Sequence, residues 1–146
     1  MKTKTKSLAR MAIFGTSFAL SATCVMAQTV GEILDKGGQR LDAAATRAIV
    51  SGVTLSGTNA AGFVGTSVYK TDGTLFSTGT RPRDNFTNSG TGTWSVDDSG
   101  KVCSKIQWNG GGSGGGCHFW FKQGDEYFTA QTEAREQAAI RRQVGK

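Results

Sequence analysis

Apolar and polar residues alternate through most of the chain beyond residue 52, as they do in strands that bury one face. Trp94 and Val96 fall on the same side of one such segment, and Ile106 and Trp108 on the same side of the next. Gly, Thr, Ser, Val and aromatic residues dominate these segments, and turn residues recur between them. The pattern predicts strands over residues 53–56, 65–70, 74–78, 92–96, 101–108, 117–122 and 126–130.

Short connectors join several of these strands. Asp72-Gly73 is a typical hairpin signal, and residues 97–100 and 123–125 are connectors of comparable length. Strands joined by such short turns pair antiparallel. We therefore expect a mainly β fold, an antiparallel meander of six to eight strands curled toward a small barrel.

Two segments outside the strands have helical propensity. Residues 41–50 (LDAAATRAIV) predict one N-terminal helix, with Asp42 as a candidate N-cap and three alanines in its first half. Residues 131–146 (QTEAREQAAIRRQVGK) form helix readily but carry few apolar side chains. They predict a C-terminal helical tail, or a frayed basic one, that does not pack on the domain.

The first 27 residues have the form of a secretory signal peptide. Its start is positively charged, at Lys2, Lys4, Lys6 and Arg10. The apolar run that follows, residues 11–25, is too short to span a membrane, and small residues precede a cleavage point after Ala27. We expect a periplasmic or secreted protein with a signal peptide (1–27), a single β-rich domain (28–130) and the tail (131–146).

The formal net charge of +6 suggests a nucleic-acid partner at first sight. Four of the 17 Lys and Arg residues, however, belong to the signal peptide, and the tail holds most of the remaining excess. The domain between them lacks the basic field of a nucleic-acid binder, so we expect no nucleic-acid partner. Arg81 and Arg83, in the long connector 79–91, form either a local site for an anionic partner or part of a solvated loop.

Three cysteines divide between two regions of the chain. Cys24 lies in the predicted signal, where the alternative to cleavage after Ala27 is a lipid anchor on this residue. Cys103 and Cys117 remain, and an even count in an exported chain predicts a disulfide, with free thiols as the alternative. Two cysteines and the single histidine fall short of a four-ligand metal site, so we expect no metal and no other cofactor.

Residues 109–116 (NGGGSGGG) form the most unusual local segment. A glycine run that cradles phosphate is normally followed by a helix N-terminus. Here a predicted strand follows, so we interpret the run as a flexible hairpin loop closed by the disulfide.

The tryptophans are the first candidates for ligand binding. Trp94, Trp108 and Trp120 either line a pocket inside the barrel or form its core. Trp120 lies on the opposite strand face from Phe119 and Phe121. If those two belong to the core, Trp120 is expected outside it or against the helix.

His118 is the single histidine of the chain and the other candidate. It is either a general base or a histidine at the rim of a strand. No nucleophile elbow adjoins it, so we assign no catalytic residues and favour a role without enzymatic activity. His118, Arg81 and Arg83 join the three tryptophans as candidate ligand-binding residues.

Several short motifs follow one another along the chain. These are LDAAATRAIVSG followed by VTLSG (41–57), YKTDG (69–73), GTWSV (92–96), Val102-Cys103, Cys117 and GDEY (124–127). Over about residues 41–128 the chain thereby resembles a group of small exported proteobacterial proteins, the domain of unknown function 995. The resemblance implies an exported small β domain with a cysteine pair and implies no activity.

Together these patterns favour a non-enzymatic binding module whose partner is a small apolar ligand, an envelope component or another protein. One alternative is a small envelope hydrolase, or an inhibitor of one, that uses His118 with nearby acids. Another is a structural envelope protein whose basic tail contacts anionic surfaces.

Overall fold

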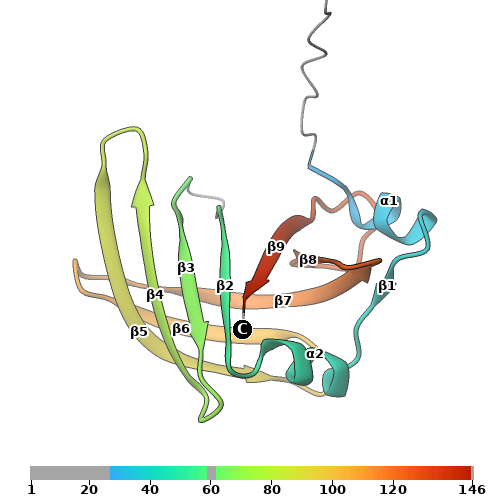
Figure 1. Ribbon diagram of the computed structural model, residues 1–146, viewed down its shortest axis with the longest axis horizontal. Coiled ribbons are helices and arrows are strands. Elements are labelled where there is room, and N and C mark those ends of the chain that lie inside the picture. Colours follow the sequence, from blue (N-terminus) through green and yellow to red (C-terminus); the bar gives the residue numbers. More distant parts are fainter. Residues whose placement is uncertain (1–26, 59–61, 146) are drawn as a thin grey trace, which may run out of the picture.

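The computed structural model describes residues 27–58 and 62–145 (Figure 1). The predicted signal peptide, apart from Ala27, and Cys24 with it, lie outside the described residues. The elements are α1 (Val30–Asp35), β1 (Gln39–Arg40), α2 (Ala43–Val50), β2 (Val53–Thr58), β3 (Val64–Tyr69), β4 (Thr74–Arg81), β5 (Phe86–Val96), β6 (Val102–Trp108), β7 (Ser113–Gln123), β8 (Glu126–Ala130) and β9 (Ile140–Gly145).

Strands β2 to β9 form a closed antiparallel barrel of eight strands. Each strand pairs with the next one along the chain, and β9 pairs in turn with β2. The ninth strand, β1, pairs with the part of β7 that extends beyond β6. The predicted antiparallel meander is confirmed, and its closure leaves no barrel strand with a free edge.

The prediction of a helical or frayed tail is wrong, because the end of the tail is the strand that closes the barrel. Ile140, Arg142 and Val144 are half-buried while the residues between them are exposed, which is the period of a strand. Ahead of β9, the buried Ala139 donates its backbone N–H to the Gln28 carbonyl at 2.7 Å. Pairing with β2 and β8 outweighs the helical propensity of this segment.

The described residues contain two short helices, of which α2 falls within the predicted segment 41–50 and α1 lies ahead of it. α2 begins after Asp42, whose carboxylate accepts a hydrogen bond from the backbone N–H of Ala45 at 2.8 Å. α1 begins with a capping box in which the side chains of Thr29 and Glu32 each accept the other's backbone N–H. The helices pack on different parts of the barrel, α2 near its inner core and α1 on the outside of β7 (Figure 1).

Two separate apolar clusters form the core. The inner cluster, inside the barrel near α2, consists of Leu41, Val50, Val53, Leu55, Leu75, Trp94, Val96, Val102 and Trp120. The outer cluster, between α1 and the barrel, consists of Val30, Ile33, Phe119, Phe121, Phe128, Ala130 and Ala139. Trp120 was expected outside the core or against the helix. It lies inside the core, in the cluster that also contains Leu41 and Val50 of the predicted helix segment 41–50. Because α1 covers the outer face of β7, that strand buries both of its faces.

Two segments predicted as loops are largely paired strand. β4 continues to Arg81 and β5 starts at Phe86, so the predicted connector 79–91 shrinks to a tight turn. In the glycine run, β7 already begins at Ser113 and pairs with β6, which leaves residues 109–112 as the loop. Glycine has weak strand propensity, but the partner strand supplies the backbone hydrogen bonds that this segment needs.

At several glycines, Gly65 and Gly92 among them, neighbouring strands approach too closely for any side chain. A Cβ at Gly65 would collide with the backbone oxygen of Thr78 on β4, and one at Gly92 with the backbone of β6. A Cβ at Gly79, by contrast, would find its nearest neighbour, the Cβ of Phe63, at 3.4 Å. Glycines such as Gly65 and Gly92, where two backbones approach closely, mark sharp bends that allow a sheet to close on itself.

Gly65→Ala is predicted to lower the free energy of unfolding by more than about 4 kcal/mol or to prevent folding, because backbone atoms cannot move aside. Gly79→Ala should stay within about 1 kcal/mol of the parent protein. Urea unfolding followed by far-UV circular dichroism compares the two variants. Equal stability would contradict the close approach at Gly65.

The predicted disulfide is confirmed. Cys103 and Cys117 stand opposite each other on β6 and β7, with a Cα–Cα distance of 4.0 Å. Both point to the outside of the barrel, because the neighbouring Val102 and His118 point inward. The bridge therefore ties the β6–β7 hairpin together without entering the barrel.

Replacing both cysteines with serine should lower the free energy of unfolding by roughly 3 kcal/mol, the loop-closure value for a segment of this length. Urea unfolding with and without reductant measures the effect. The parent protein should lose stability when reduced, whereas the double variant should not respond to reductant at all. A parent protein that ignores full reduction would contradict a stabilising bridge.

Candidate functional site

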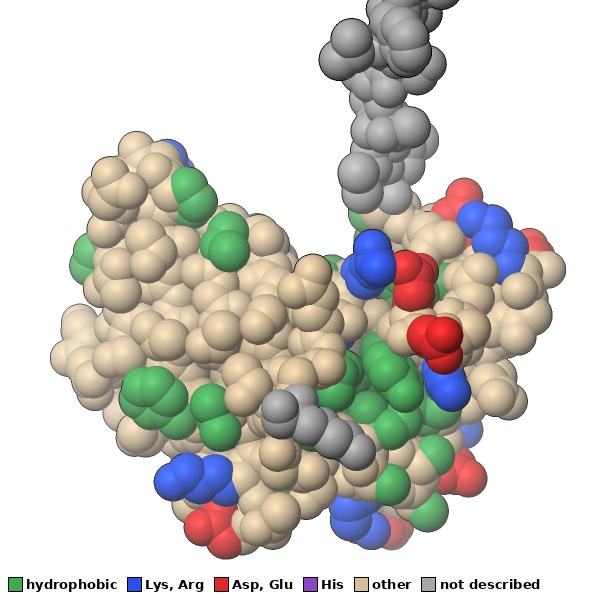
Figure 2. Space-filling view, in the orientation of Figure 1, with side chains coloured by type: hydrophobic (Ala, Val, Ile, Leu, Met, Phe, Trp, Pro, Cys, Tyr) green, Lys and Arg blue, Asp and Glu red, His purple; other side chains and the backbone are tan. Residues whose placement is uncertain are grey.

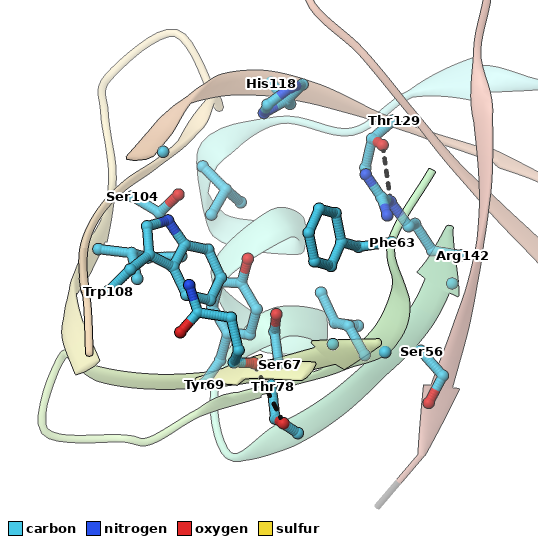
Figure 3. A pocket seen from close by; sticks show the side chains of 18 of the residues that line it. Ser56, Phe63, Ser67, Tyr69, Thr78, Ser104, Trp108, His118, Thr129 and Arg142 are labelled. Atoms are coloured by element: carbon cyan, nitrogen blue, oxygen red, sulfur yellow. Dashed lines mark hydrogen bonds between the residues drawn. The ribbon is translucent and has the colours of Figure 1, made fainter. Parts of the chain in front are cut away.

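The inside of the barrel contains a partly open cavity of about 420 Å³ (Figure 3). Its wall draws residues from strands on every side of the barrel, since β2 to β9 all contribute. Leu55, Val102 and Trp120 belong both to this wall and to the inner core cluster, so the core closes the cavity on the side of α2. In the space-filling view the surface is hollowed between the ends of β2–β5 and the side that carries α1 (Figure 2).

The cavity wall is mainly apolar, with separated polar groups. The apolar side chains are those of Leu55, Phe63, Val102, Ile106, Trp108 and Trp120. Hydroxyl groups come from Ser67, Tyr69, Ser104 and Thr129 (Figure 3), and Asn88 also lines the cavity. His118 and Arg142 add two basic groups, and no Asp or Glu of the described ranges lines the cavity.

The three predicted tryptophans divide between cavity and core. Trp108 and Trp120 line the cavity. Trp94 belongs to the inner cluster, where its indole N–H donates to the Lys70 carbonyl at 2.9 Å and its ring lies edge-on to Tyr69 at 5.5 Å. Trp94 thus supports the cavity-lining Tyr69 from behind.

The two predicted arginines lie away from the cavity wall. Arg81 is paired with Asp84 across the β4–β5 turn, with a shortest N–O distance of 2.6 Å. Its guanidinium also lies over the rings of Phe63 and Phe86, at 5.3 and 5.4 Å from their centroids. Arg83 is exposed in the turn itself. These contacts hold the hairpin tip together rather than form an anion site.

His118 is inside the barrel, opposite Val102 on β6. Burial, with a smaller contribution from the positive charge of Arg142, lowers the pKa of His118 below its ordinary value of 6.5. The ring is therefore neutral at neutral pH. None of the described carboxylates or hydroxyls forms a hydrogen bond with it, so no nucleophile and base are assembled here.

Arg142 is a cavity residue that sequence reasoning missed, and the aromatic residues Tyr69 and Phe63 line the cavity as well. Arg142 was assigned to a tail that packs on nothing, although the alternation of Ile140, Arg142 and Val144 is a signal for a strand. Because side chains of a strand alternate between its two faces, Arg142 lies on the same, buried face as Ile140 and Val144.

Comparison with known proteins finds no match to this chain among protein-family models, curated proteins or solved structures. Neither α1 nor α2 is long and apolar enough to cross a membrane, and they are the helices of the described ranges. Across residues 27–58 and 62–145, no three His, Cys, Asp or Glu side chains come together as metal ligands. Fold and site together define a small closed β-barrel with an internal, mainly apolar cavity.

The lowered pKa of His118 predicts that the protein loses stability as the pH falls through about 6.5. The unfolded chain binds this proton more readily than the folded one, so stability rises with pH across this window and levels off above it. His118→Gln should flatten the dependence. Thermal unfolding between pH 5 and pH 7.5 measures it.

The exposed carboxylates act in a separate window. Hydrogen bonds from neighbouring residues lower the pKa of Asp72, Asp84 and Asp97 below 3.8. The stability that they contribute is lost only below about pH 4.

A His118→Gln variant as sensitive as the parent protein between pH 5 and 7 would contradict the role of His118.

Proposed function

We propose that this protein is an exported, non-enzymatic binding module whose barrel holds a small and largely apolar ligand. The observation that carries the proposal is the cavity of about 420 Å³ with its aromatic and aliphatic wall. Small-molecule sites usually measure about 300–1,000 Å³ and combine such a wall with a few separated polar groups. Barrels of eight strands are wide enough to hold one small ligand.

Export, and membership of the group with the domain of unknown function 995, are parts of the same proposal. The charged and apolar pattern of residues 1–27 supports export to the periplasm or beyond. The Cys103–Cys117 disulfide is compatible with that location, because such bridges persist in oxidising compartments. The short motifs between residues 41 and 128 support the family.

No observation favours the two alternatives over ligand binding. A hydrolase needs an acid and a hydroxyl at His118, and the described residues do not place them there. A structural protein with a free basic tail does not agree with β9, because Arg142 points inward and Arg141 pairs with Glu126 at 2.5 Å.

A substitution that fills the cavity tests the proposal. Ser104→Phe places a large side chain among the cavity residues, whereas Ser95→Phe makes the same change at an exposed position on β5. Phenylnaphthylamine, an uncharged and apolar fluorescent probe, should bind to the parent protein and to Ser95→Phe. It should not bind to Ser104→Phe, because the space is occupied.

Fluorescence titration measures probe binding, and far-UV circular dichroism verifies that each variant is folded. A parent protein that binds neither this probe nor any other small apolar molecule would contradict the proposed function. Equal binding by folded Ser104→Phe and Ser95→Phe would place the site outside the barrel.

A further inference from the structure

Arg142 is a cation that points into the barrel. It lies on β9 opposite Tyr127 of β8, and it is half-buried in the cavity wall. Its Nε donates a hydrogen bond to the hydroxyl oxygen of Thr129 at 2.9 Å (Figure 3). This contact orients the guanidinium but does not neutralise its charge.

Four other arginines of the described chain form ion pairs, and these pairs lie on the surface. Arg40 pairs with Glu133, Arg81 with Asp84, Arg135 with Asp35 and Arg141 with Glu126. Arg142 forms no ion pair with any carboxylate of residues 27–58 or 62–145, although it is the arginine inside the cavity. A guanidinium withdrawn from water in this way costs free energy unless an anion accompanies it.

The neighbouring groups of the described cavity wall do not neutralise the charge of Arg142. Burial lowers the pKa of Arg142. Burial also raises the pKa of Tyr69, whose hydroxyl therefore stays protonated and able to donate a hydrogen bond. His118 is neutral for the reason given above. Among the described residues of the cavity wall, Arg142 is thus the one that carries a formal charge at neutral pH.

A row of three glycines crosses β2, β3 and β4, and its first member, Gly57, lies beside Arg142. Gly57, Gly65 and Gly79 stand opposite one another on β2, β3 and β4, and all three line the cavity. A Cβ at Gly57 would lie 3.4 Å from Nη1 of Arg142, which places the guanidinium directly beside this glycine. Beside Nη1 of Arg142, strand β2 therefore presents backbone without a side chain.

We propose that Arg142 binds the carboxylate of an amphipathic ligand, an apolar monocarboxylic acid, whose body lies in the apolar part of the cavity. Two N–H groups of one guanidinium match the two oxygens of a carboxylate. The apolar body would contact Phe63, which projects into the cavity between Arg142 and Trp108 (Figure 3). This inference rests on the proposed function and adds the chemical class of the ligand.

Decanoate and decanol test the proposal, because they share a chain and differ in the charge of the head. Each displaces phenylnaphthylamine from the parent protein, and decanoate should bind more tightly than decanol. Arg142→Gln should weaken decanoate binding by about tenfold to a hundredfold, the effect of losing hydrogen bonds to a charged group. It should leave decanol binding close to that of the parent protein.

Two further variants separate charge recognition from folding. Arg142→Lys keeps the positive charge and should recover part of the preference for decanoate. Arg141→Gln removes the neighbouring arginine of β9, which points outward, and should leave both affinities unchanged. Since the readout is the ratio of the two affinities within each folded variant, a general loss of stability does not mimic the result.

The outcomes distinguish this inference from the proposed function. If decanol and decanoate bind equally well and Arg142→Gln changes neither, the barrel binds apolar molecules but the carboxylate assignment is wrong. If neither compound nor the uncharged probe binds to the parent protein, the proposed function itself fails. A preference for decanoate that disappears in Arg142→Gln and persists in Arg141→Gln supports the assignment.

Discussion

The pairing of β9 with β2 and β8 is the constraint on which the rest of the structure depends. Without it, β2 and β8 would each present an unpaired row of backbone groups, and the sheet would stay open. Closure encloses the cavity, and it also decides which β9 side chains enter that cavity. The same pairing turns Arg142 inward, while Arg141 points outward to Glu126.

The second determinant is the burial of both faces of β7. Trp120 belongs to the inner cluster, and Phe119 and Phe121 belong to the outer cluster under α1. The inner cluster fills the barrel on the side of α2. The glycine row of β2, β3 and β4 leaves space beyond it. The cavity therefore arises from a change in side-chain size along the inside of the barrel, from large aromatic residues to glycine.

Two of the polar side chains that line the cavity, Arg142 and Tyr69, are held in place by contacts with neighbouring residues. Thr129 orients Arg142, and Trp94 supports Tyr69 through an edge-on ring contact. The disulfide lies on the outer face of the hairpin whose inner face carries His118, so it stabilises the wall without changing its chemistry. Within the described residues the cavity wall thus combines apolar side chains with one cation, Arg142, and the proposed ligand class rests on this combination.

The sequence by itself determined the local features: the alternation around Trp94 and Val96, the Asp42 cap, the Asp72-Gly73 turn and the Cys103–Cys117 pair. Each of these depends on neighbouring residues or on a simple count, so the tertiary structure left them unchanged. It did not determine the state of the tail, the pairing of the glycine run or the two-sided burial of β7. Those depend on partners distant in the chain, because β9 becomes a strand only where β2 and β8 offer their edges, and Phe119 is core only where α1 covers it.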